Sequence, residues 1–241
     1  MPQLIISSAD INDQLVELKD SNYHHLKSLR FKINESVVLI DEHGNQYNGR
    51  IEKIKNNKAI LRITDKITLT KNESGIILVQ SIIKREKMLI ALQKTTEIGV
   101  DEIIPLISQY TVVKIKNTNH MKRWQSAIND AVEQSMRNSI PMLHEPLTLK
   151  QLFKLFPDTT KLMFHNNVAY TPVDSCVDVI KSSRHLMLII GPEGGFSEEE
   201  IKLALINHVN ILHLGKNILR SETASIVAAG LISFIKGLHS I

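Results

Sequence analysis

The chain has 241 residues, 43% of them hydrophobic, which suits one large domain or two smaller ones with sizeable cores. Its 29 Lys and Arg against 25 Asp and Glu give a net charge of +4, a mild indication of nucleic acid binding. A single cysteine, Cys176, excludes an internal disulfide and is typical of a reducing compartment. The apolar stretches are too short to span a bilayer and no signal-like segment is seen, so the expected location is cytoplasmic.

Residues 1–72 consist of short β-type segments separated by polar turns. Strands are predicted at 36–41, 46–54 and 59–64. Short strands joined in this way favour a small barrel. Short helices are expected at 10–17 and 21–30, folded onto that barrel.

From residue 73 to residue 241 the pattern changes to an alternation of strands and helices. Strands are predicted at 76–82, 102–106, 161–164, 186–190 and 209–214, and helices at 87–98, 121–137, 198–207 and 224–238. This alternation is typical of an α/β domain with a mostly parallel sheet. We therefore expect two domains, 1–72 and 73–241.

A glycine-rich stretch from Gly191 to Ser197 follows one predicted strand and precedes a helix, and ligands bind at this edge of open α/β sheets. Its glycines at 191, 194 and 195 lack the Cβ atoms that would keep a flat ligand away from the backbone. Ser197 and Glu200 form a capping box, so a helix is expected to begin where the turn ends. A plain strand-to-helix turn is the alternative, since turns also favour Gly and Pro.

A second stretch, from Leu214 to Ala224, has the same position relative to its strand and helix. Arg220, Ser221, Glu222 and Thr223 stand at the mouth of a nearly all-apolar helix that should be buried. Charges there are costly unless they pair with each other or with a ligand. An ion pair between Arg220 and Glu222 is the structural alternative to a ligand.

The residues of these two stretches resemble the signature loops of the RsmE-type 16S ribosomal RNA (uracil-N3)-methyltransferases, which belong to the SPOUT superfamily of trefoil-knot enzymes. The resemblance covers most of the chain and continues in Gln93 to Val100, Arg123-Trp124, Glu133 to Arg137, His25, Leu29-Arg30 and Asp41-x-x-Gly44-x-x-Tyr47. It implies a C-terminal SPOUT α/β trefoil-knot methyltransferase domain and a small N-terminal PUA-like RNA-binding β-barrel.

The resemblance also implies the reaction and the partners. S-adenosyl-L-methionine would methylate N3 of one specific uridine in 16S rRNA or the small ribosomal subunit, and a homodimer interface would complete the pocket. The cofactor would lie bent among three loops, one of which brings His165 and Asn166 beside it. The expected cofactor contacts are Phe164, His165, Ile190, Gly191, Pro192, Glu193, Gly194, Leu214, Gly215, Ile218, Leu219, Arg220, Thr223 and Ala224.

Uridine N3 carries a proton and becomes a nucleophile only once that proton leaves. Arg220 is the first candidate for stabilising the resulting anion through a uracil carbonyl oxygen. Glu193 and Glu222 are candidates for the base, although each could instead pair with Arg220 or with the cofactor's ammonium group. Arg30, Lys94, Arg123 and Arg137 are the candidates for RNA phosphate contacts.

Two other functions remain open. A SPOUT methyltransferase acting on another RNA, such as transfer RNA, would share the cofactor fold. A non-catalytic RNA-binding module would keep the barrel while tolerating damaged loops. Rossmann and P-loop fingerprints are absent, and the ten histidines show no metal-ligand spacing, so no metal is expected.

Overall fold

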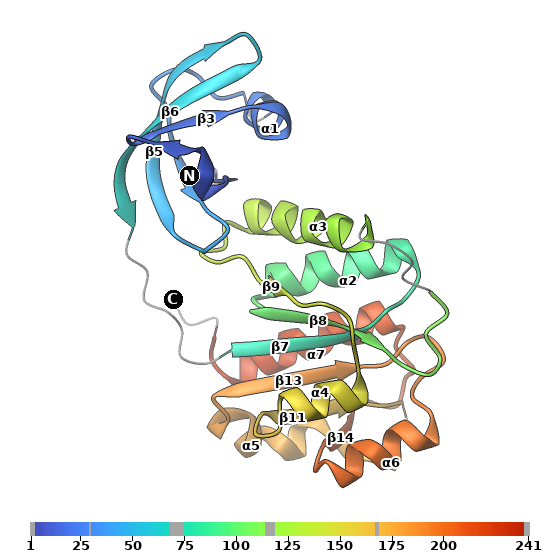
Figure 1. The fold of residues 1–241 in the computed structure, drawn as a ribbon. Helices are drawn as coiled ribbons and strands as arrows, with labels where there is room; N and C mark the ends of the chain where they lie inside the picture. Colours follow the sequence, from blue (N-terminus) through green and yellow to red (C-terminus); the bar gives the residue numbers. More distant parts are fainter. Residues whose placement is uncertain (1–2, 29, 68–74, 114–118, 167–168, 239–241) are drawn as a thin grey trace. The chain divides into compact units, whose positions relative to one another are not determined.

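The structure is a computed structural model that describes residues 3–28, 30–67, 75–113, 119–166 and 169–238 (Figure 1). Leu29 of the predicted RNA-binding motif lies outside these residues. The chain forms two compact units, Met1–Lys71 with Asn129–Ile140, and Asn72–Ile128 with Pro141–Ile241. The domain limits 1–72 and 73–241 stay a prediction, because the segment Asn129–Ile140 clusters with the first unit.

The first unit contains, within the described residues, a six-stranded sheet in the order β1-β4-β5-β6-β3-β2. β1 pairs with β4 in parallel, and the other neighbours are antiparallel. Alternate strand residues and helix α1 bury one apolar core that includes Leu18, Leu26 and Leu39. The elements are β1 Gln3–Ile5, a 3₁₀ helix Ser8–Asp10, β2 Ile11–Asn12, β3 Leu15–Leu18, α1 Asp20–Ser28, β4 Ser36–Ile40, β5 Gln46–Lys55 and β6 Lys58–Ile67.

The helix expected at 10–17 is wrong, because these residues form most of the β2-β3 hairpin. Asp13 and Gln14 have φ values of 46° and 66°, a left-handed pair that turns the chain. Val16 then pairs with Ile11 and is fully buried. Pairing of β3 with β6 therefore determines that this segment is extended. A local pattern of residues cannot reveal that pairing.

The motif Asp41-x-x-Gly44-x-x-Tyr47 forms the turn between β4 and β5. Asp41 Oδ1 accepts hydrogen bonds from the backbone N–H groups of His43 and Asn45, at 2.9 and 2.8 Å. The Tyr47 hydroxyl donates to Asp41 Oδ2 at 3.1 Å, and Gly44 has a φ of 77°. In this structure the motif stabilises the turn of the β4-β5 hairpin.

The segment Asn129–Ile140 belongs to the first unit through hydrogen bonds to its first strand. The Ile5 N–H donates to Glu133 Oε1 at 2.8 Å, and Gln3 Nε2 donates to the Arg137 carbonyl at 2.8 Å. His25 Nε2 lies 3.3 Å from Glu133 Oε2. Burial raises the pKa of Glu133, while the Ile5 hydrogen bond and His25 oppose that rise. The Glu133 to Arg137 motif thus has a structural role here.

The second unit is built on a parallel sheet in the order β10-β8-β7-β13-β11-β14-β12, with β9 beside β8. This confirms the predicted strand-helix alternation. Its strands are β7 Gly75–Ser81, β8 Glu102–Ile107, β9 Met142–Leu143, β10 Leu147–Thr148, β11 Thr160–Phe164, β12 Thr171–Pro172, β13 His185–Ile190 and β14 Asn210–His213. Its helices are α2 Arg85–Ile98, α4 Leu149–Leu155, α5 Val177–Ser182, α6 Glu198–Ile206 and α7 Ser221–Ile235, with a 3₁₀ helix at Val173–Cys176 and α3 Asn119–Ser135 shared with the first unit.

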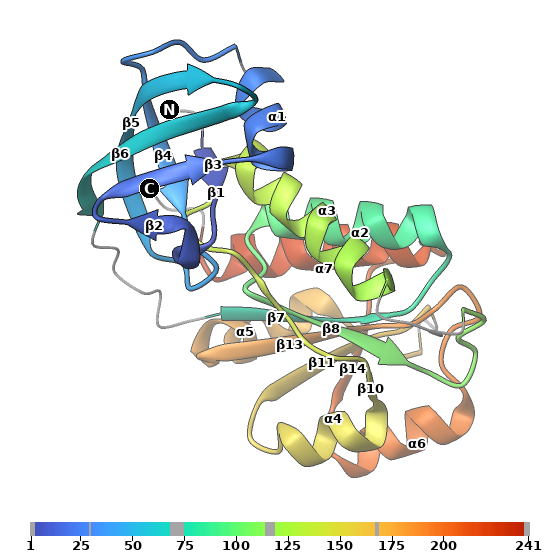
Figure 2. The same ribbon diagram turned by 45° about the horizontal axis from the view of Figure 1, so that its top comes forward.

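Helices cover both faces of this sheet. α4 and α6 pack on one face, over a core that includes Val79, Ile104 and Ile189, and α2 and α7 lie on the other (Figure 2). After β14 the chain crosses back over β11, and α7 packs against β7, β13 and α2. That return brings the start of α7 beside the end of β13.

Candidate functional site

A cavity of about 240 Å³ opens at the carboxyl ends of β11, β13 and β14. Parallel strands leave their helix-bound loops on this edge, which is why ligand sites gather there. Three segments form the walls, one after each of the three strands, as predicted. The lining residues are Phe164, His165, Asn166, Ile190, Gly191, Pro192, Glu193, Gly195, Phe196, Leu214, Gly215, Asn217, Ile218, Leu219, Arg220, Ser221 and Ala224.

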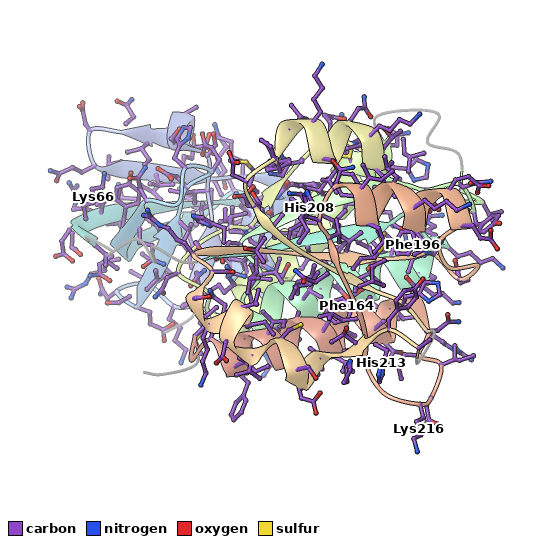
Figure 3. All side chains as sticks on the ribbon, turned by 90° about the horizontal axis from the view of Figure 1, so that it is seen from below. Lys66, Phe164, Phe196, His208, His213 and Lys216 are labelled. Atoms are coloured by element: carbon purple, nitrogen blue, oxygen red, sulfur yellow. The ribbon has the colours of Figure 1, made fainter. Side chains whose placement is uncertain are left out.

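All the predicted cofactor contacts line this cavity except Gly194 and Thr223. Phe196, Asn217 and Ser221 also line it and were not expected there. Gly195 lines it too, and it was expected to expose backbone to a ligand although it was not among the expected cofactor contacts. The helix was expected to begin at residue 224, whereas α7 begins at Ser221 with Arg220 as its N-cap residue. Lys216, at the tip of the second loop, points away from the body of the unit (Figure 3).

The three glycines of the first loop are needed for three different reasons. A Cβ on Gly191 would lie 3.1 Å from the Phe196 ring, which itself lines the cavity. A Cβ on Gly194 would lie 3.1 Å from Tyr110 Cβ, so this glycine makes room for Tyr110. Gly195 has a φ of 73°, which disfavours any residue with a side chain.

The capping box predicted at the start of α6 is confirmed. The Glu200 N–H donates to Ser197 Oγ at 3.2 Å, and the Ser197 N–H donates to Glu200 Oε2 at 2.9 Å. Glu200 Oε1 also accepts the Gln109 N–H at 2.9 Å. One carboxylate thereby fixes the end of the glycine-rich loop against the loop that follows β8.

The charged candidates have different surroundings. Arg220 lines the cavity, is exposed, and forms no ion pair with any described residue, so the alternative pair with Glu222 is not found. Glu193 also lines the cavity and lies 3.3 Å from Lys87 Nζ. Glu222 is buried in the first turn of α7 outside the cavity lining, and its Oε2 has no hydrogen-bond partner among the described residues.

His165 stands at the end of β11 on the cavity wall. Its backbone N–H donates to the Leu212 carbonyl at 2.8 Å, and its ring lies edge-on to Tyr170 with centroids 5.4 Å apart. Burial lowers the pKa of the imidazole below its ordinary value of 6.5. The cavity therefore contains a neutral imidazole at pH 7.

The four predicted RNA contacts are divided between the two units. Arg30 and Arg137 belong to the first unit, and Arg30 is exposed with a φ of 59°. Lys94 and Arg123 belong to the second unit. Lys94 pairs with Glu97 at 2.8 Å, and Arg123 pairs with Glu86 at 3.3 Å.

The described part of the chain holds no group of three His, Cys, Asp or Glu side chains placed to bind a metal ion. No helix in that part is long and apolar enough to cross a membrane.

Two family models match the chain. One, described as an RNA methyltransferase domain, covers residues 70–233, and the other, described as an RNA methyltransferase PUA domain, covers residues 18–64. Together with the parallel sheet and its edge cavity, they define an RNA methyltransferase with an N-terminal PUA domain. Within that class the chain belongs to the ribosomal RNA small subunit methyltransferase E family. A member from Rickettsia conorii is 28% identical over 98% of this chain and 96% of its own length.

Solved structures agree with this assignment. A methyltransferase from Legionella pneumophila, in complex with S-adenosylmethionine, is 33% identical with a TM-score of 0.85 over 96% of each chain. A ribosomal RNA small subunit methyltransferase E from Neisseria gonorrhoeae, bound to the same molecule, is 30% identical with a TM-score of 0.85 over 98% of each chain. The predicted family and fold class are therefore confirmed.

Proposed function

We propose that this chain methylates N3 of one uridine in 16S rRNA, in the cytoplasm, with S-adenosylmethionine as its methyl donor. Membership of the ribosomal RNA small subunit methyltransferase E family supports the enzyme class, the rRNA substrate and the cofactor. The observation that carries the N3 assignment is the cavity wall, where Arg220, which has no carboxylate partner among the described residues, stands beside apolar side chains.

The cavity residues fit the cofactor. Gly191, Gly195 and Gly215 expose backbone at the cavity, and Ile190, Leu214 and Leu219 add apolar surface. Backbone donors and acceptors with apolar walls suit a nucleoside with a sulfonium-bearing arm. When bound, the cofactor supplies an electrophilic methyl group on a sulfonium. We propose that all the predicted cofactor contacts hold it except Gly194 and Thr223, which support the loops from outside.

Arg220 acts on the nucleophile in this proposal. A guanidinium beside a uracil carbonyl oxygen stabilises the negative charge left when the N3 proton departs, which lowers the pKa of the imide. The apolar walls favour the step in which an anion and a cation form neutral products. Arg220 can do this because no described carboxylate neutralises it.

Glu193 receives the proton in this proposal. It is the predicted base that lines the cavity, whereas Glu222 does not. Lys87 Nζ, 3.3 Å from Glu193 Oε1, limits the rotation of that carboxylate. Glu222 lies in the first turn of α7, where a negative charge interacts favourably with the positive end of the helix dipole. Its role in this proposal is to stabilise the helix.

We propose that RNA is held through phosphates by Arg30 and Arg137 of the first unit and by Lys94 and Arg123 of the second. Such contacts position the RNA without reading its sequence. The carboxylate partners of Lys94 and Arg123 would be exchanged for phosphate on binding.

We propose further that the enzyme is a homodimer. α7 also carries apolar side chains on its exposed face, where Phe234 is 76% exposed and Leu231 is 38% exposed. Ile90 of the neighbouring α2 is also exposed. A second copy would cover this apolar surface, which is costly in water.

The test of the reaction is mass mapping of 16S rRNA from cells that lack this protein. Loss of one N3-methyluridine, restored by the purified protein and S-adenosylmethionine, is the expected result. Methylation of transfer RNA instead, or RNA binding without methyl transfer, would support the alternative functions and overturn this one.

A further inference from the structure

A buried polar side chain interrupts the apolar core beneath the cavity. Gln80 follows four apolar residues of β7 and is fully buried. Its Nε2 donates to Ser221 Oγ at 3.0 Å and to the Ser81 carbonyl at 2.8 Å, and its Oε1 accepts a hydrogen bond from Ser225 Oγ. An amide placed here is costly unless its groups are satisfied, and these partners satisfy it.

The hydrogen bonds continue from Gln80 into the cavity wall. Ser221 Oγ donates to the Gly191 carbonyl at 2.6 Å, and both residues line the cavity. β7, the start of α7 and the end of β13 are therefore joined by one connected set of side-chain bonds. Ser221 is 141 positions from Gln80 and 30 from Gly191, so these two bonds join segments that are distant in the sequence.

The direction of each bond follows from its partners. A carbonyl can only accept, so the amide nitrogen of Gln80 must face Ser81. That nitrogen also donates to Ser221, whose oxygen therefore accepts. The single hydroxyl hydrogen of Ser221 is then free to donate to Gly191. Gln80 thus bonds Ser221 without competing for the hydroxyl hydrogen that Ser221 donates to the Gly191 carbonyl.

We propose that Gln80 is a positioning residue of the cofactor site. It holds the start of α7, which carries Arg220 and Ser221, at a fixed separation from the loop that begins at Gly191. Arg220 is the N-cap residue and makes no side-chain capping bond, so the bonds of Ser221 and Ser225 to Gln80 are the side-chain contacts that hold this helix start. The proposal rests on the proposed function in one respect, because it takes this cavity as the S-adenosylmethionine site.

Two substitutions test the link. Gln80→Met keeps nearly the same volume and removes the hydrogen bonds. Gln80→Glu sets a carboxylate oxygen against the Ser81 carbonyl and draws the Ser221 hydrogen away from Gly191. We expect S-adenosylmethionine to bind about tenfold more weakly to the Met variant, and more weakly still to the Glu variant. In the cofactor-free protein, backbone hydrogen exchange should become faster at residues 190–197 and 220–225.

A matched control lies on the same helix. Ser233 is also a buried serine of α7, and Ser233→Ala should change neither the affinity nor the exchange at these loops. If Gln80→Met binds the cofactor as tightly as wild type with unchanged exchange, the proposal is wrong. It is equally wrong if Ser233→Ala has the same effects, because general loosening of α7 would then explain them.

These measurements separate the proposal from the proposed function. Cofactor binding is measured without RNA, so a protein that binds the cofactor but leaves 16S rRNA unmodified would contradict only the proposed reaction. If wild type binds no S-adenosylmethionine, the proposed cofactor role of Gln80 fails with it. Hydrogen exchange of the cofactor-free protein would still decide whether Gln80 links the two loops.

Discussion

Lys87 Nζ lies 3.3 Å from Glu193 Oε1, an ion pair that joins the first turn of α2 to the loop after β13. It neutralises a carboxylate on one wall of the cavity. On another wall, Arg220 has no such partner among the described residues. The cavity therefore has an uncompensated positive charge, which suits a reaction that passes through a nucleobase anion.

Arg220→Ala should lower methyl transfer by about 100-fold or more and weaken cofactor binding far less than that, because a cation that acts on the anion contributes mainly to the transition state. Single-turnover transfer to 16S rRNA and calorimetric binding of S-adenosylmethionine measure the two effects. Lys216→Ala is the control, since this cation of the same loop points away from the unit (Figure 3). Full turnover by Arg220→Ala would refute the role.

Glu193→Gln should slow methyl transfer by about 100-fold, within the range for loss of a general base. Glu222→Gln should leave the rate within a few-fold of wild type, because Glu222 does not line the cavity. Rates at saturating cofactor and RNA distinguish the two carboxylates. A slow Glu222 variant beside a fast Glu193 variant would reverse the assignment.

His165 should make folding stability depend on pH below neutrality. Its pKa in the folded protein is lower than the value of 6.5 in the unfolded chain. Between the folded and the unfolded pKa, the unfolded chain therefore binds more protons than the folded protein does. Stability is therefore lost as the pH falls below 6.5 and is unaffected by this group above it. Melting temperatures from pH 8 to pH 5.5 should fall less for His165→Asn than for wild type. Parallel curves would show that His165 does not titrate as inferred.

Phe234→Glu should convert a dimer into a monomer, because it places a charge in the apolar surface of α7 that a second copy would cover. Light scattering after size exclusion gives the mass directly. Leu155→Glu on α4 is a matched control, since Leu155 is 62% exposed on the opposite face of the sheet. A dimer that survives Phe234→Glu would place the interface elsewhere.

RNA affinity should fall steeply with added salt, because phosphate contacts release counterions. Arg30→Ala should reduce the slope of log affinity against log salt by about one contact. Filter binding of 16S rRNA fragments between low and physiological salt measures that slope. A slope that Arg30→Ala leaves unchanged would remove Arg30 from the contact set.

Much of the molecule could be predicted from local patterns. Strand-helix alternation indicated the parallel sheet, and the two polar stretches after strands indicated the cavity that Phe164, Gly191 and Gly215 now line. Ser197 and Glu200 are three residues apart, and their capping box depends only on helix geometry. Such features are encoded over a few residues, so the sequence by itself determines them.

Tertiary contacts decided the rest. Residues 10–17, expected as a helix, lie mostly in a hairpin because β3 forms backbone hydrogen bonds with β6. Glu193 and Glu222 looked equivalent along the chain, yet packing exposes one to the cavity and buries the other. Gln80 meets Ser221 across 141 positions. Burial and hydrogen bonding depend on which distant residues the fold brings together, and no local pattern contains that information.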